Sequence, residues 1–160
     1  MPNSRTFSIK PIRELIQKYA NGYTIDPFAA GNRLANVTND IDPQYDTDFH
    51  MDATDFLNLF KPDSVDTVLY DPPYSPRQVA ECYKALGITV NMQTTQASYW
   101  SRQKEAIGRI VKKKGGIVIT CGWNSGGIGK KYGFEIIEIL LVAHGGWHND
   151  TIVTVEKKVL

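Results

Sequence analysis

Hydrophobic residues follow two spacings along the chain, and each predicts a different kind of element. At residues 12–19 they recur every three or four positions, as on one face of an amphipathic helix. Pro11 suits the first turn of that helix, and Asn21 and Gly22 end it. The same spacing predicts further helices over residues 56–60, 76–86 and 98–114.

Compact hydrophobic runs bounded by turn residues form the second pattern, which is typical of strands. The run at 65–70 fits a strand buried on both faces, as in a parallel sheet. Residues 88–97 lack a clear period and are expected to form a loop. Other strands are expected at residues 23–26, 36–40, 117–121, 134–143 and 151–157.

The order of these elements predicts the fold class. Strands alternate with helices early in the chain, and a short turn at 144–150 joins the last two strands as a hairpin. We therefore expect an α/β fold, a three-layer sandwich whose mostly parallel sheet has one antiparallel strand near the C-terminus.

Composition is that of an ordinary globular protein. With 160 residues, 42% hydrophobic and 22% charged, the chain is expected to form a single domain over residues 1–160. A net charge of +1 argues against a generally basic nucleic-acid-binding protein. A nucleic acid would therefore have to bind a local basic patch.

The cysteines and histidines give no sign of a metal site or a disulfide framework. Cys82 and Cys121 are the only cysteines and form no CxxC pair. His144 and His148 have no cysteine or acidic companions at ligand spacing. The sequence shows neither a secretory leader nor a membrane-spanning hydrophobic run, so a cytoplasmic protein without a membrane partner is expected.

Four aspartates fall at or near the ends of predicted strands, namely Asp26, Asp40, Asp52 and Asp71. Ligands of open α/β sheets bind beyond the carboxyl ends of the strands, so these acids are expected to converge on one crevice. A carboxylate after the second strand commonly binds a ribose diol, so Asp40, with Asp42 as its rival, indicates an adenosine-containing cofactor. Read singly, each acid is more often a helix cap or a turn former.

The segment VLYDPPYSPRQ at 68–78 places an acid, two prolines and an aromatic ring directly after the buried strand. It resembles the DPPY motif of amino-methyltransferases that use S-adenosylmethionine. The resemblance implies that Asp71 and the carbonyl of Pro72 accept hydrogen bonds from a nucleobase amine, while Tyr74 stacks on the extruded base. Pro72 and Pro73 have fixed φ, which keeps the acceptors aimed. The alternative is a strand-terminating turn in which the aspartate caps the backbone.

The resemblance covers most of the chain. IDPF, TNDID and HMDATDFL follow one another in the order of the family's cofactor-binding segments, and FSIKPI lies where its methionine-side motif lies. The resemblance implies a class I methyltransferase (Rossmann-like) fold, S-adenosylmethionine as cofactor and no metal. The implied cofactor-binding residues are Lys10, Pro11, Asp26, Pro27, Phe28, Ala29, Gly31, Asp40, Ile41, Asp52, Ala53 and Asp71.

Two features depart from the family pattern. The family's Gly-x-Gly turn is replaced by the run Phe28-Ala29-Ala30-Gly31-Asn32, which weakens the expectation of cofactor affinity. The stretch between the first two strands is also short for a parallel crossover, so a helix of about one turn or none is expected there.

The family usually carries a target-recognition domain after the DPPY segment, and the second half of this chain is expected to be too short for one. Specificity is therefore expected from loops at residues 75–78, 88–97 and 123–125, from a homodimer partner or a separate specificity subunit, or to be absent. The expected substrate-binding residues are Tyr74, Ser75, Arg77 and Asn124.

Together these features predict an enzyme that methylates N6 of adenine, in DNA foremost. The same chemistry would serve cytosine N4 or an adenine in RNA. A different alternative is a non-catalytic subunit that binds nucleic acid or a partner protein through a degenerate cofactor site.

Overall fold

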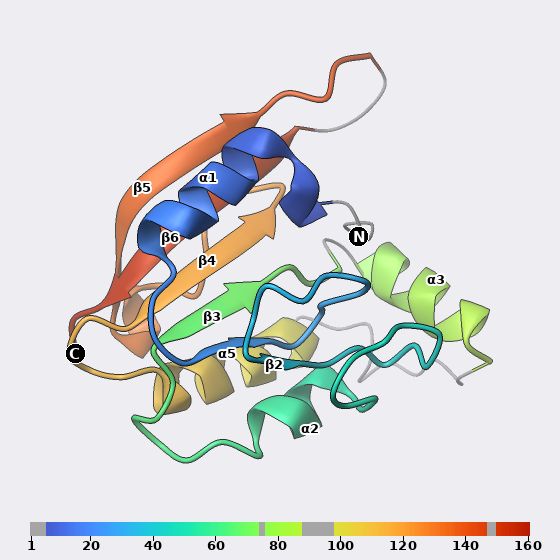
Figure 1. Cartoon of the computed structure of the whole chain (residues 1–160), viewed down its shortest axis with the longest axis horizontal. Helices are drawn as coiled ribbons and strands as arrows, with labels where there is room; N and C mark the ends of the chain where they lie inside the picture. The colour runs from blue at the N-terminus through green and yellow to red at the C-terminus, as the bar shows by residue number, and fades with distance from the viewer. Residues whose placement is uncertain (1–5, 74–75, 88–97, 147–149) are drawn as a thin grey trace.

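A computed structural model describes residues 6–73, 76–87, 98–146 and 150–160. Its centre is a six-stranded sheet in the order β2-β1-β3-β4-β6-β5 (Figure 1). The strands are β1 (Thr24–Asp26), β2 (Val37–Thr38), β3 (Thr67–Tyr70), β4 (Ile117–Gly122), β5 (Phe134–Val142) and β6 (Thr151–Lys158).

Strand directions confirm the predicted sheet. β2, β1, β3 and β4 run parallel to one another, with Ile25 opposite Val37 and Val68 opposite Val118. β6 lies antiparallel to both β4 and β5, and the β5 ladder shifts register between Ile136 and Glu138. The sheet is thus mostly parallel, with one strand reversed near the C-terminus.

Helices cover both faces of the sheet and complete three layers (Figure 1). α1 packs on one face, where a buried cluster joins it to β4, β5 and β6, and α2 and α5 cover the other face. The helical elements are η1 (Thr6–Ser8), α1 (Lys10–Tyr19), α2 (Ala53–Leu57), α3 (Pro76–Ala85), α5 (Ser98–Ile110) and η2 (Lys130–Tyr132).

Three predicted elements have different bounds in the structure. β2 spans only Val37–Thr38 because β1 is followed by Pro27, which has no amide to donate, and the Thr38 carbonyl accepts from the amide of Phe49 at 3.1 Å instead. α2 begins at Ala53 rather than at residue 56, because Asp52 caps it. α5 ends at Ile110, before the three lysines, because Val111 pairs with Val65 in a β-bridge. The predicted loop at 88–97 lies outside the described residues.

A buried carboxylate on β6 holds the glycine-rich segment after β4. Glu156 is fully buried and accepts hydrogen bonds from the amides of Ile128 and Gly129, at 2.7 and 2.9 Å. Gly127 has φ +55°, and a Cβ there would meet the Glu156 carboxylate at 2.2 Å. Only glycine fits this position, so the segment is held against the Glu156 side chain on β6.

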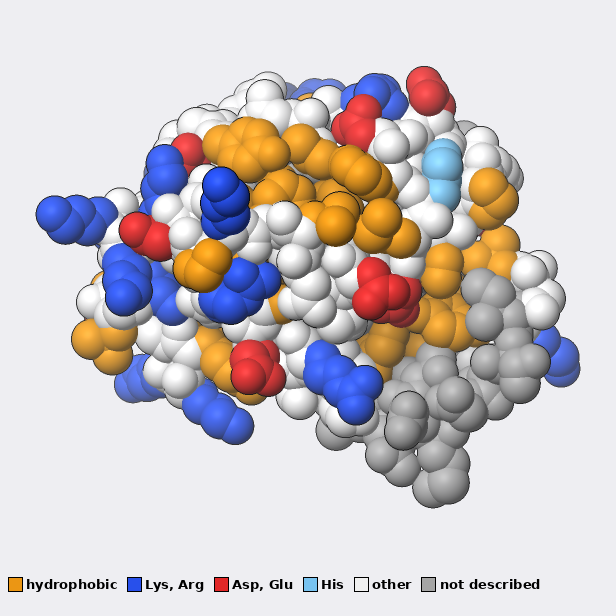
Figure 2. Space-filling model, turned by 90° about the horizontal axis from the view of Figure 1, so that it is seen from below, with side chains coloured by type: hydrophobic (Ala, Val, Ile, Leu, Met, Phe, Trp, Pro, Cys, Tyr) orange, Lys and Arg blue, Asp and Glu red, His pale blue; other side chains and the backbone are white. Residues whose placement is uncertain are grey.

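The face beneath the sheet carries an exposed hydrophobic patch (Figure 2). Aromatic rings contact one another near α2, with centroids 6.2 Å apart for Tyr23–Phe60 and 5.1 Å apart for Phe56–Phe60. Lysine and arginine side chains lie mostly at the left of this view.

Among the described helices, none is long and apolar enough to span a bilayer.

Candidate functional site

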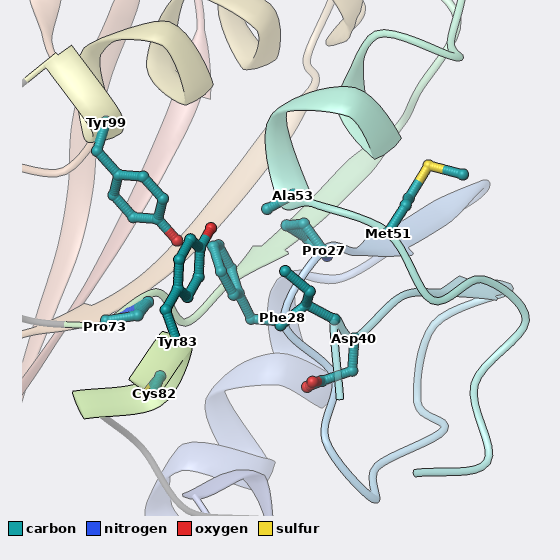
Figure 3. A pocket seen from close by; sticks show the side chains of 10 residues that line it. Pro27, Phe28, Asp40, Met51, Ala53, Pro73, Cys82, Tyr83 and Tyr99 are labelled. Atoms are coloured by element: carbon teal, nitrogen blue, oxygen red, sulfur yellow. The ribbon is translucent and has the colours of Figure 1, made fainter. Parts of the chain in front are cut away.

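A pocket of about 320 Å³, partly open to solvent, lies beyond the C-terminal ends of β1, β2 and β3 (Figure 3). This volume includes open solvent at the mouth of the pocket. Asp40 stands on one side, and the hydroxyl ends of Tyr83 and Tyr99 point toward each other on the other side. The lining residues are Pro27, Phe28, Asp40, Ile41, Met51, Ala53, Pro73, Cys82, Tyr83 and Tyr99.

Asp40 is a buried carboxylate just beyond β2. Its Oδ2 accepts from the amide of Ala30 and its Oδ1 from the amide of Asp42, both at 2.9 Å. Burial raises the pKa of Asp40, while these two amide bonds act against the rise. Each oxygen still has a second lone pair, so the carboxylate can also accept hydrogen bonds from a ligand's hydroxyl groups.

The turn after β1 adopts a conformation that usually needs glycine. Ala30 has φ +48°, in the left-handed region, and its amide donates to Asp40. Ala29 extends the arrangement by donating its amide to the carbonyl of Asn39 at 2.9 Å. The chain therefore keeps a tight turn where the family pattern has glycine, at the cost of a left-handed alanine.

Asp26 is fully buried at the end of β1. Its Oδ1 accepts from the amide of Phe28 at 3.0 Å, and its Oδ2 accepts from the Asn32 side chain at 3.2 Å. Burial and, to a smaller extent, the charge of Asp40 raise the pKa of Asp26 to about 8, although the two hydrogen bonds oppose the shift. The carboxyl group is therefore largely protonated at neutral pH.

This raised pKa makes stability fall with rising pH. The folded protein holds a proton on Asp26 up to about pH 8, whereas the unfolded chain loses it near the ordinary value of 3.8. We expect the free energy of unfolding to decline between about pH 4 and 8 by an amount on the order of 5 kcal/mol at most from this group. Asp26→Asn should flatten that part of the profile in urea unfolding. A slope equal to that of the wild type would contradict the assignment.

Asp52 links the two halves of the pocket wall. Its Oδ1 caps α2 by accepting from the Thr54 amide at 2.9 Å, and its Oδ2 accepts from the Tyr83 hydroxyl on α3 at 2.8 Å. Burial raises the pKa of Tyr83 well above its ordinary value, so the hydroxyl stays a neutral donor. α2 and α3 are thus joined directly through a carboxylate beside the pocket.

Removing this link should cost stability. Tyr83→Phe keeps the ring, which packs edge-on against Tyr99 with centroids 6.4 Å apart, and deletes only the hydroxyl. We expect the free energy of unfolding to fall by about 1 kcal/mol in urea titration, because one hydrogen bond to a carboxylate is lost. Tyr23→Phe is the matched control, since Tyr23 is 40% exposed, and it should change little. Equal stability of both variants would refute the link.

The segment after β3 reaches the pocket through Pro73, whereas Asp71 and Pro72 are not among the residues that line it. Asp71, Pro72 and Pro73 are all buried, and Pro73 lines the pocket. Burial raises the pKa of the Cys121 thiol, and the charges of Asp71 and Asp26 raise it further, so both acids lie near the end of β4. Tyr74 and Ser75 lie outside the described residues, as does the side chain of Arg77.

The structure brings together part of the predicted site. Six predicted residues line the pocket directly: Pro27, Phe28, Asp40, Ile41, Ala53 and Pro73. Asp52 borders the wall through Tyr83, while Asp26, Ala29 and Asp71 are buried at the adjoining strand ends. Gly31 is exposed beside the turn at Ala30.

Three predicted residues lie elsewhere on the surface. Lys10 and Pro11 are exposed at the start of α1, where Lys10 lies 3.9 Å from Glu14, and neither lines the pocket. Asn124 is exposed after β4 and accepts a hydrogen bond from the amide of Gly126.

Four lining residues were not predicted as site residues, namely Met51, Cys82, Tyr83 and Tyr99. The helical spacing of Cys82 and Tyr83 marks them as inward-facing, but that signal equally fits an ordinary core. In the described part of the chain, no group of three or more His, Cys, Asp or Glu side chains is arranged to hold a metal ion.

Comparison with known proteins identifies the fold through structure alone. No protein-family model matches the sequence, and no curated protein matches it either. TrmN from Thermus thermophilus superposes with a TM-score of 0.59 at 17% identity, over 97% of this chain and 53% of that one. The chain thus spans about half the length of TrmN.

Two further structures are similar over nearly the whole chain. yhhF from Escherichia coli gives a TM-score of 0.59 at 10% identity, over 100% of this chain and 91% of that one. The N-methyltransferase NodS from Bradyrhizobium japonicum WM9 was crystallised in complex with S-adenosyl-L-homocysteine. It gives a TM-score of 0.51 at 9% identity, over 96% of this chain and 86% of that one. The chain has the class I methyltransferase fold.

Proposed function

We propose that the protein transfers a methyl group from S-adenosylmethionine to the exocyclic amine of a nucleobase, N6 of adenine in DNA foremost. The observation that carries this proposal is one pocket bounded by Asp40 on one side and by the turn after β3 on the other. The fold supports it, because NodS has the same fold and was crystallised with S-adenosyl-L-homocysteine.

The described pocket residues fit an adenosine-containing cofactor. Asp40 offers a buried carboxylate for a ribose diol, and Ile41 and Ala53 offer apolar surfaces for the flat faces of a purine. Asp52 lies beside them. Its carboxylate already accepts a hydrogen bond from the Tyr83 hydroxyl and would also accept one from the purine amine. When bound, S-adenosylmethionine supplies an electrophilic methyl group.

The turn after β3 carries the acceptors for the substrate amine. A nucleobase amine is a poor nucleophile because its lone pair is delocalised into the ring. Hydrogen bonds to the Asp71 carboxylate and the Pro72 carbonyl would draw the nitrogen toward tetrahedral geometry, which frees the lone pair for attack on the methyl carbon. After transfer, Asp71 would accept the proton that the amine releases.

The aromatic surroundings of the turn favour a flat substrate. Phe28, Tyr83 and Tyr99 line the pocket near Pro73, and Trp100 packs edge-on against Tyr99 with centroids 5.3 Å apart. Aromatic side chains stack readily on a base that has left its helix. Tyr74, which follows Pro73, is proposed to provide the stacking face itself.

Titration calorimetry and a methyl-transfer assay test this function together. The purified protein should bind S-adenosylmethionine, and with it should transfer labelled methyl to DNA or RNA oligonucleotides that contain adenine. Binding without transfer to any base would favour the non-catalytic alternative. No binding at millimolar ligand would refute the proposal altogether.

A further inference from the structure

Two hydrogen bonds from one side of α5 hold both ends of the turn that carries Asp71 and Pro72. The indole N–H of Trp100 donates to the carbonyl of Pro73 at 2.9 Å. Gln103 accepts from the Tyr70 hydroxyl at 2.7 Å through its side-chain oxygen. Trp100 and Gln103 are three residues apart in a helix, so they share one face.

The turn needs anchors of this kind because of its prolines. Pro72 and Pro73 have no amide hydrogen, so they cannot donate to a neighbouring strand. Their φ angles are fixed by the ring, but ψ at each residue is not. A donor on the Pro73 carbonyl fixes the peptide plane at the end of the turn, and the Tyr70 bond fixes the end of β3 before it.

The anchors are protected from competing water. Gln103 is fully buried and Tyr70 is 1% exposed, so their bond lies in the core. Trp100 is half-buried and packs against Tyr99, which is itself 6% exposed and lines the pocket. The indole ring is thus held in place by its packing, and its N–H points at one backbone oxygen.

We propose that Trp100 is a positioning residue for the methyl transfer. Its indole N–H, together with Gln103, holds the turn so that the Asp71 carboxylate and the Pro72 carbonyl face the substrate amine together. This inference rests on the proposed function. α5 would thereby orient a turn in which Pro72 and Pro73 have no amide hydrogen to donate.

The test replaces the indole N–H and leaves the ring in place. 3-Benzothienylalanine, introduced at position 100 by stop-codon suppression, has nearly the shape of tryptophan but carries sulfur instead of N–H. We expect kcat to fall about tenfold or more, because small misplacements of acceptors reduce rate steeply. The dissociation constant for S-adenosylmethionine and the midpoint of urea unfolding should stay close to those of the wild type. Trp100→Phe should lower kcat at least as much.

These measurements separate positioning from packing. An unchanged kcat in the benzothienyl variant would overturn the inference, and so would losses of kcat, affinity and stability in parallel. If the wild type itself transfers no methyl group, the proposed function fails and its assignment to Trp100 falls with it. Hydrogen exchange of the Trp100 indole proton, followed by NMR, tests the anchor independently of activity. The proton should exchange much more slowly than that of a free indole, and rapid exchange would overturn the anchor whatever the activity.

Discussion

Asp71→Ala is expected to abolish methyl transfer while leaving cofactor binding largely intact. The variant removes the side-chain acceptor from the turn after β3 and leaves the Pro72 carbonyl alone. Loss of one preorganised electrostatic group in an active site typically lowers kcat by about 100- to 1000-fold, and Asp71 would also accept the released proton. Single-turnover transfer of labelled methyl, at saturating cofactor, measures the effect.

The control for this variant is Asp55→Ala, since Asp55 is an exposed acid in the first turn of α2. Its activity should match that of the wild type. Asp71→Asn keeps one acceptor oxygen and should retain more activity than Asp71→Ala. Full turnover in Asp71→Ala would show that the amine is activated by other groups, and the proposed role of the turn would be wrong.

Asp40→Ala is expected to weaken S-adenosylmethionine binding by about 100-fold. A ribose diol that donates to a buried carboxylate forms charge-assisted hydrogen bonds, which contribute about 1.5–3 kcal/mol each. Calorimetry gives the affinity. Because Asp40 also accepts from the amides of Ala30 and Asp42, the unfolding midpoint has to be measured on the same sample.

The neighbouring acid supplies the matched comparison. Asp42 is partly exposed and accepts from the amide and side chain of Gln44, and it does not line the pocket. Asp42→Ala should bind the cofactor as the wild type does. Asp40→Asn keeps one acceptor and should fall between the wild type and Asp40→Ala. If Asp42→Ala loses the affinity instead, the two acids have been assigned in the wrong order.

Local patterns predicted the elements of the fold well because few tertiary contacts override them. The helix at 12–19 appears as α1 (Lys10–Tyr19), with Ile12, Leu15 and Ile16 buried, and the run at 65–70 contains the fully buried β3. The misplaced bounds arise from backbone contacts that the local pattern does not show. Pro27 leaves β1 without a donor for a longer β2, and the bridge between Val65 and Val111 ends α5 early.

The site was predicted less completely because half of its wall comes from helices. The residues at strand ends, such as Pro27 and Asp40, follow from the rule that parallel strands present their carboxyl ends together. Tyr83 comes from α3 and Tyr99 from α5, and their rings meet at the pocket with centroids 6.4 Å apart, a contact that no local pattern specifies. Ala30 shows the same limit, since its left-handed backbone is set by the bond to Asp40.

The most direct test is mass spectrometry of nucleosides digested from the DNA and RNA of cells that express the protein. We expect a methylated amino nucleoside, N6-methyldeoxyadenosine foremost, above the level in matched cells that express Asp71→Ala. A product in RNA or on cytosine N4 would keep the chemistry and change the substrate. Identical nucleoside profiles for the wild type and Asp71→Ala, with both proteins folded and abundant, would contradict the proposed methyl transfer.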